Sequence, residues 1–332
     1  MSEDSKETGA WRTVVSKYQR SSNVRALWQL INTLGPYTLL WVAMYFAVSL
    51  SYWLVVPLAV LAGAFLVRVF IIFHDCTHGA YVPSKSANAA LGTILGVLVF
   101  TSYHHWRWEH LAHHAGAGNL DRRGMGAVWT LTVREYIEAS WFKKFSYRIV
   151  RNPLVLFVLA PVFLFAVLNR IPRRTAKDNV RIWTHLTTAG IVILAVCLAS
   201  IYGVLPYIII QSIILAVSSS IGVWLFYVQH QFEDVNWERQ KNWDFVKAAL
   251  HGSSYYKLPK LLQWISGNIG LHHIHHLSPY IPNYRLQLAQ DSEPLFQNVE
   301  PMTLLDSLKA ITLHLWDEDA KQLVPFSAIR SL

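Results

Sequence analysis

Four long apolar stretches dominate the pattern of hydrophobic and polar positions along the chain. Residues 37–56 carry no charged side chain, and Pro57 separates them from the next apolar stretch. A second pair of stretches is separated by a short uncharged turn. About 20 apolar residues are enough to cross a bilayer as a helix. The pattern therefore predicts four membrane-spanning helices in two hairpins, at about residues 37–56, 58–78, 182–201 and 205–228.

Two shorter apolar stretches need a separate interpretation. Residues 91–103 are too short to span a bilayer comfortably. Residues 153–169 are longer, but they contain Pro153 and Pro161 and have arginines on both sides. Positive charge at both ends of a segment argues against a crossing. We therefore expect both stretches to form re-entrant or interfacial helices.

Composition and charge support a membrane protein. Of the 332 residues, 53% are hydrophobic and 15% are charged, whereas soluble domains carry about a quarter charged residues. The net charge of +9 comes without a recognisable nucleic-acid-reading motif, so we expect no nucleic-acid partner. Much of the positive charge flanks the apolar stretches, as in cytoplasmic loops. We expect cytoplasmic segments at 1–35 and 291–332 and a membrane domain at 36–290.

Histidines gather in three short clusters. In the first cluster two histidines are four residues apart, and in the other two the spacing is i, i+3 and i+4, which places the imidazoles on one helical face. A lone histidine is usually an ordinary interior residue, but eight in matching clusters exceed the four ligands of a structural zinc site. The pattern favours two metals and leaves their identity open. The clusters are His74 and His78; His110, His113 and His114; and His272, His275 and His276.

The position of the clusters relative to the membrane separates two classes of protein. With two hairpins and no other crossing, all three clusters lie on the cytoplasmic side, at or beyond the helix ends. A metal transporter usually places its ligands near the bilayer midplane, within broken helices. The arrangement therefore favours an enzyme over a metal transporter or sensor.

The segments around these histidines resemble the three histidine boxes of the membrane fatty acid desaturase family. The segments are HDCTH, WRWEHLAHH and GNIGLHHIHHLSPYIPNY. The similarity extends from about residue 35 to residue 290 and is greatest to bacterial acyl-lipid desaturases of the Δ12/Δ5-like kind. It implies an all-α integral-membrane fold, with a cytoplasmic helical cap that carries the boxes. It also implies two iron ions, and oxygen as the co-substrate that removes two hydrogens from an acyl chain.

The resemblance assigns metal-binding roles to individual residues. The eight clustered histidines become ligands, and His230, just after the last apolar stretch, becomes a ninth. Some relatives carry an asparagine one turn before this histidine, where this chain has Phe226. Asn268 is a candidate substitute near the third box. Asp75 and Glu109 adjoin ligands and would orient their imidazoles, unless they are simply solvated or ion-paired helix charges.

The resemblance also implies partners and a location. The chain has no cytochrome b5 segment and no dinucleotide-binding fingerprint, so we expect a separate electron donor such as ferredoxin. We expect the substrate to be a lipid-borne acyl chain and the location to be the inner membrane of a bacterium. The alternative activity is a related hydroxylase or ketolase that acts on alkanes, carotenoids or sphingolipids.

Overall fold

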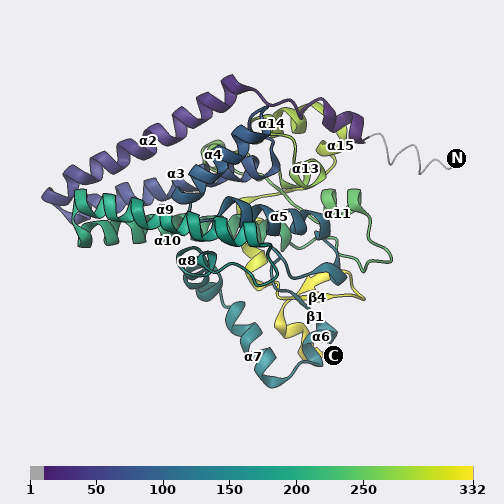
Figure 1. Cartoon of the computed structure of the whole chain (residues 1–332). Coiled ribbons are helices and arrows are strands. Elements are labelled where there is room, and N and C mark those ends of the chain that lie inside the picture. Colours follow the sequence, from purple (N-terminus) through teal and green to yellow (C-terminus); the bar gives the residue numbers. More distant parts are fainter. Residues whose placement is uncertain (1–10, 332) are drawn as a thin grey trace.

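Two long helical hairpins form the body of the molecule. The computed structural model describes residues 11–331, with 1–10 and 332 left aside, so the predicted segments 1–35 and 291–332 are described only in part. The first hairpin consists of α2 (Asn23–Leu50) and α3 (Tyr52–His78), and the second of α9 (Asp178–Tyr202) and α10 (Val204–His230). Figure 1 shows these four helices reaching to one side as long rods. In the described residues, all four are long and apolar enough to cross a membrane, which confirms the predicted all-α membrane class.

The break inside the first hairpin differs from the predicted one. It lies at Ser51 and not at Pro57, which sits within α3. Ser51 has an extended backbone, and its side chain accepts a hydrogen bond from the backbone N–H of Trp53, which caps the new helix. Pro36 is likewise inside α2, and prolines are tolerated in membrane helices. Residues 23–35, predicted to precede the first span, therefore belong to its helix.

The second hairpin turns at Gly203. This residue has a φ of 85° and a ψ of 151°, a backbone conformation that is readily available only to glycine. The turn lies where the sequence predicts it, between the stretches 182–201 and 205–228. Helix α10 continues to His230, two residues beyond the predicted end of the span.

Two bent pairs of helices occupy the positions of the shorter apolar stretches. Helices α4 (Lys85–Leu98) and α5 (Tyr103–Gly116) meet at 104°. Helix α7 (Trp141–Val150) meets the segment 155–170 at 63°. That segment consists of a π-helical turn η2 (Val155–Leu159), α8 (Ala160–Ala166) and a 3-10 turn η3 (Leu168–Arg170).

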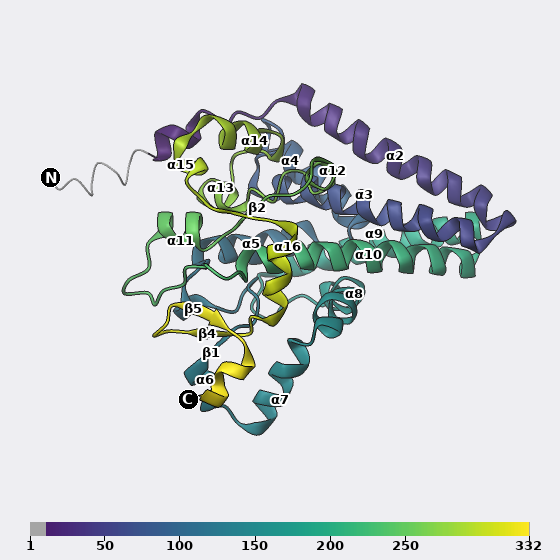
Figure 2. The ribbon, with the colours of Figure 1, turned by 180° about the vertical axis from the view of Figure 1, so that it is seen from behind.

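A cap of short helices covers one end of the hairpins (Figures 1 and 2). Its helices are α6 (Val133–Ile137), α11 (Phe245–His251), α12 (Lys260–Ile265), α13 (His272–Leu277), α14 (Asn283–Ser292), α15 (Pro294–Gln297) and α16 (Leu304–Ser307). The 3-10 turns are η1 (Leu120–Arg122), η4 (Leu308–Thr312) and η5 (Phe326–Ser331).

Two very small sheets in the cap were not predicted. In one, β1 (Leu131–Thr132) runs parallel to β4 (Leu315–Asp317), which pairs antiparallel with β5 (Gln322–Val324). In the other, β2 (Tyr255–Tyr256) runs parallel to β3 (Pro301–Met302). Strands of two or three residues are too short to produce a readable alternation of polar and apolar side chains.

Helix α3 is the central element of the fold. It packs against α2, α10 and α4. In its most apolar stretch of 18 residues 56% of the residues are buried, against 17% to 28% in the corresponding stretches of the other three long helices. Its last turns, from Ile71 to His78, are completely buried. The first histidine cluster therefore sits at the inner end of the most enclosed helix, under the cap.

Candidate metal centre

All nine histidines predicted as ligands meet in two buried groups. Within each group, one nitrogen from each imidazole lies within 4.8 Å of the others. We call these groups the five-histidine group and the four-histidine group. The five-histidine group is His74, His78, His110, His114 and His275, and the four-histidine group is His113, His230, His272 and His276.

Helices α5 and α13 bridge the two groups. Each gives two histidines that are four residues apart to one group, and the histidine between them to the other. The face of each helix that the sequence predicts as a single ligand surface therefore spans two sites. Helix α5 gives His110 and His114 to the five-histidine group and His113 to the other, while α13 gives His272 and His276 to the four-histidine group and His275 to the other.

The ends of the long helices complete the groups. Helix α3 supplies His74 and His78 to the five-histidine group, and the last residue of α10, His230, belongs to the four-histidine group. Because α5 and α13 share both groups, the chain must cross the membrane an even number of times between them. Helices α9 and α10 are long and apolar enough to provide two crossings, and a lone third crossing by the bent segment 141–170 would then separate the ligands of each group.

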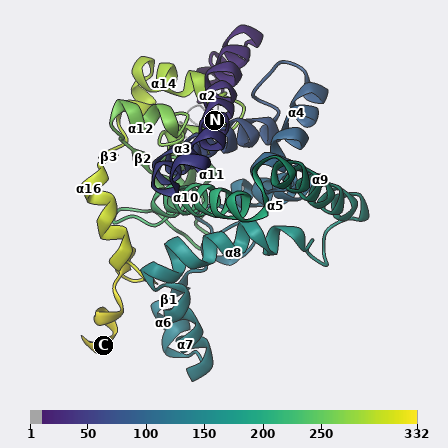
Figure 3. The same cartoon turned by 90° about the vertical axis from the view of Figure 1, so that its left-hand side faces the viewer.

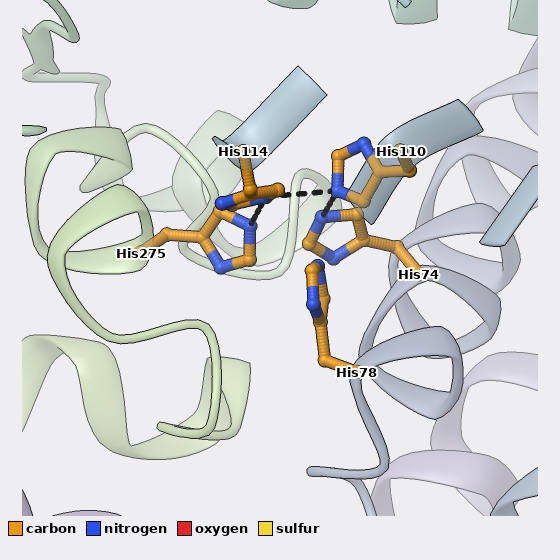
Figure 4. Close-up of side chains that lie close together, drawn as sticks. All are labelled: His74, His78, His110, His114 and His275. Carbon is orange, nitrogen blue, oxygen red and sulfur yellow. Dashed lines mark hydrogen bonds between the residues drawn. The ribbon is translucent and has the colours of Figure 1, made fainter. Parts of the chain in front are cut away.

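In the five-histidine group the imidazole nitrogens face one another (Figure 4). The Nε2 atom of His110 lies 3.0 Å from that of His74 and 3.0 Å from that of His114, which is 3.1 Å from the Nε2 atom of His275. His78 is buried with no hydrogen-bond partner for either ring nitrogen among the described residues. Nitrogens that converge in this way, without other partners, form a cradle for a metal ion.

The four-histidine group has the same kind of geometry. The Nε2 atom of His230 lies 3.1 Å from that of His113 and 3.0 Å from that of His272, and the Nε2 atoms of His272 and His276 are 3.1 Å apart. The ring of Phe226 lies 5.2 Å from the rings of both His113 and His230. An apolar ring thus lies beside two of the four imidazoles of this group.

Burial keeps these imidazoles neutral. Loss of solvent lowers the pKa of the cap histidines well below the usual value of 6.5, and neighbouring imidazoles lower the pKa further. The histidines with this shift are His110, His113, His114, His272, His275 and His276. Neutral imidazole is the form that binds a metal, and divalent first-row ions suit a nitrogen donor set. The two groups can therefore bind metal ions.

Asp75 connects the five-histidine group to the cap. Its Oδ1 atom lies 3.2 Å from Nδ1 of His74, and its Oδ2 atom accepts hydrogen bonds from the backbone N–H and the side-chain amide of Asn283 at 2.6 and 2.8 Å. Asn283 in turn accepts a hydrogen bond from Gln29 of α2. This buried series of hydrogen bonds fixes the carboxylate beside the His74 ring. A carboxylate in that place sets the orientation and tautomer of the imidazole.

Glu109 and Asn268 make other contacts. Glu109 pairs with Arg173 and lies 4.0 Å from His105, and no contact joins it to a histidine of either group in the described residues. Asn268, with a φ of 60°, donates a hydrogen bond to the backbone carbonyl of Asn283. Asn268 therefore supports Asn283, which holds Asp75, and does not contact the histidines directly.

An apolar cavity leads to the histidines. It has a volume of about 370 Å³, and helices α3, α5, α8 and α10 contribute to its wall. His74, His110 and His272 line it, so it reaches both groups. Trp106, also in the wall, stacks on His110 with ring centroids 4.1 Å apart. A cavity with a mostly apolar wall suits an alkyl chain.

Comparison with known proteins identifies the family. The family model described as "Fatty acid desaturase" matches residues 51–299. A fatty acid desaturase from Bacillus subtilis is 46% identical over 318 residues, which cover 96% of this chain and 90% of the relative. The chain belongs to the fatty acid desaturase family.

Two more distant members of the fatty acid desaturase family have more specific names. The sn-1 acyl-lipid omega-3 desaturase (ferredoxin) from Synechocystis is 26% identical, with 74% of this chain and 69% of the relative covered. The sn-1 oleoyl-lipid 12-desaturase from Anabaena variabilis is 26% identical, with 75% and 71% covered. The predicted resemblance to this family is thus confirmed, and its members are oxidoreductases.

Sequence reasoning missed two polar residues of this desaturase-family centre. Asn283 and Gln29 are buried next to Asp75, yet they come from opposite ends of the chain. Asn283 belongs to the motif LSPYIPNY, which follows the third histidine box. An asparagine that directly follows a proline after the third box was the signal available. Nothing marks Gln29 in the sequence apart from its being polar within an apolar helix.

Proposed function

We propose that the protein is a membrane fatty acyl desaturase that introduces a carbon–carbon double bond into a lipid acyl chain, using oxygen and two electrons. The observation that carries this proposal is the apolar cavity, because it ends at histidines of both groups. An apolar slot beside two nitrogen-rich metal sites is what oxidation of an unactivated alkyl chain requires.

The nine histidines would hold two iron ions, one in each group. The irons would supply the oxygen activation, which protein side chains cannot perform by themselves. The chain itself fixes the imidazoles: Asp75 orients His74, and Asn268 supports Asp75 through Asn283. Glu109 would hold Arg173 at the rim of the cavity, which both residues line.

The cavity would position the acyl chain. Its wall on α10 extends from Leu215 to Gln229, a distance of about 20 Å at the rise of an α-helix. An extended alkyl chain along this wall would present one pair of methylenes to the histidines. Apolar residues such as Leu66 and Phe70 of α3 line the same space and exclude water.

Topology and partners follow from the same proposal. We place the chain in the inner membrane of a bacterium, with the histidines, the N-terminal segment and the segment after residue 290 in the cytoplasm. Exposed basic residues such as Lys143 and Arg174 support this orientation. The names of the relatives support an acyl-lipid substrate, and the cyanobacterial relative named with ferredoxin supports a separate electron donor of that kind.

The test is expression of the full chain in a bacterial host that lacks this activity, followed by mass spectrometry of its fatty acids. The expected product has lost two hydrogens and carries a double bond at one position. A product that has gained one oxygen atom instead would show a hydroxylase. Reversible binding of a single metal, with no new fatty acid, would contradict the enzyme proposal and favour a transporter or sensor.

A further inference from the structure

A second cavity lies on the other side of α3. It has a volume of about 700 Å³ and is formed by α2, α3, α12 and α14 together with the segment around β2. Val67 and Ile71 of α3 face the apolar cavity, whereas Arg68 faces the second one, because successive helical residues point about 100° apart. Figure 3 shows α12 and α14 on the side of α3 away from α8. We call this space the basic cavity.

Arg68 is a buried cation whose partners are all neutral. Its side chain is in a membrane-spanning helix, and the residue is 5% exposed. The Nε atom donates to Oγ1 of Thr33 at 3.0 Å, a terminal nitrogen donates to the carbonyl of Trp264, and the guanidinium lies 4.0 Å from the centre of the Trp264 ring. No carboxylate pairs with it among the described residues. Buried charge of this kind is costly without a counter-ion and marks a functional site.

Three further cations surround the same space. Arg25, Lys257 and Lys260 line the basic cavity, and within residues 11–331 none of them forms an ion pair. One carboxylate in the lining, that of Asp291, accepts a hydrogen bond from Gln287. The cavity therefore has a clear excess of positive charge, which favours an anionic ligand.

The surroundings narrow the class of anion. Trp28 and Trp264 line the basic cavity and are both exposed, and exposed tryptophans beside basic residues are typical of the level of lipid headgroups. Arginine and lysine together bind phosphate well, the arginine through its planar fork and the lysine as a point charge. We propose that the basic cavity binds a phosphate group, with Arg68, Lys257 and Lys260 as its cationic partners.

This site is separate from the space assigned to the acyl chain. Helix α3 and the segment 268–272 lie between the two cavities, with their residues divided between the two walls. Gln29 and Asn283 line the basic cavity, so a bound phosphate group lies against the chain of hydrogen bonds that holds Asp75. The phosphate belongs either to a lipid headgroup or to free inorganic phosphate, and the experiment distinguishes these sources.

The test is a binding measurement on the purified full chain in detergent, without any activity assay. Three probes are compared: short-chain phosphatidic acid, a diacylglycerol with the same acyl chains, and inorganic phosphate. Phosphatidic acid is expected to bind about tenfold or more tightly than diacylglycerol, because the acyl chains of both probes can enter the apolar cavity and only phosphatidic acid carries the phosphate group. Additional binding of inorganic phosphate would identify free phosphate as a ligand, and its absence would identify the lipid headgroup as the ligand.

The variants make the site itself testable. The double variant Lys257→Gln/Lys260→Gln removes two exposed cations and should weaken phosphatidic acid binding about tenfold or more, since each charge-assisted hydrogen bond contributes strongly to affinity. Adding Arg68→Gln to this double variant should weaken phosphatidic acid binding further. The matched control Lys143→Gln/Lys241→Gln removes two exposed lysines that lie outside the cavity. Wild-type affinity in the first double variant, or equal binding of diacylglycerol, would overturn the proposal.

Discussion

The two histidine groups are made from the same side chain but are supported differently. The five-histidine group has a carboxylate beside it, because Asp75 contacts His74 and is itself held by Asn283. The four-histidine group contains no such contact among the described residues. Instead, His113 and His230 line a small cleft of about 40 Å³. Both groups border a cavity, and among the described residues only the five-histidine group has a carboxylate that holds one of its imidazoles.

This difference shows how one set of helices builds two unlike sites. Helices α5 and α13 serve both groups with the same spacing of histidines, so the spacing does not create the asymmetry. The asymmetry comes from the long helices. Helix α3 contributes two histidines and Asp75 to the five-histidine group, while α10 contributes His230 and the neighbouring Phe226 to the four-histidine group. We therefore expect the five-histidine group to retain its metal better than the four-histidine group after the loss of one nitrogen.

The largest expected effect comes from removing one ligand from each group. His275→Ala leaves four nitrogens in its group, and His276→Ala leaves three in the other. Fatty acid desaturation should fall by more than about 100-fold in both variants, since the substitution of a residue that only orients a ligand already lowers activity by about 10–100-fold. Metal analysis should show the greater loss of metal in His276→Ala.

The control for this pair is His251→Gln, which changes an exposed histidine outside both groups. It should retain its metal and its fatty acid products. Equal metal loss in His275→Ala and His276→Ala would mean that the number of nitrogens does not distinguish the two groups.

The next effect tests the brace on the five-histidine group. Asp75→Asn keeps the shape of the side chain but removes the negative charge beside Nδ1 of His74, and it disturbs the two hydrogen bonds from Asn283. Desaturation should fall about 10–100-fold. Glu109→Gln is the matched change at a carboxylate that contacts Arg173 instead, and it should lower product formation less. A larger loss in Glu109→Gln would reverse the assigned roles.

A moderate effect is expected in the cavity through which substrate would reach both groups. A Cβ atom at Gly222 meets no atom within 4 Å, and this glycine lines the apolar cavity. Gly222→Val should therefore fold, narrow the slot and change the chain length or double-bond position of the products, as read by mass spectrometry. Gly35→Val, at another open glycine but outside the cavity, should leave the product profile unchanged.

The smallest effect concerns a histidine outside both groups. Burial and the nearby Arg151 and Arg148 lower the pKa of His314 to about 4. Its neutral form thus stabilises the fold above pH 6.5, and this contribution is lost as the pH falls toward 4, because the unfolded chain binds the proton first. Thermal unfolding should show a smaller decrease in Tm between pH 7 and pH 5 in His314→Gln. An unchanged pH dependence would contradict this assignment.

The sequence predicts the hairpins and the clusters because both signals are local. Long apolar stretches and the i, i+3, i+4 spacing can be read within a few turns of helix. The exact break at Ser51 was missed because Pro57 looks like the stronger interruption, although a serine cap ends one helix and starts the next. The division of each box between two sites depends on how α5 faces α13, which no local pattern contains.

The polar support of the centre was harder to predict for the same reason. Gln29 and Asn283 are 254 positions apart in the sequence, and their contact exists only after α2 packs against the cap. Glu109 adjoins a ligand in the sequence but turns toward Arg173 in space. The position of a carboxylate next to a ligand in the sequence therefore does not predict which side chain it contacts in the structure.

The sharing of α13 between the two groups has a consequence for biosynthesis. This helix follows all four long helices in the chain, so neither group is complete on the ribosome until both hairpins have been made. A chain that inserts with one crossing too many would leave α13 on the wrong side of the membrane, and each group would lack part of its nitrogens. Only chains that have inserted with the correct topology would then bind metal in both groups.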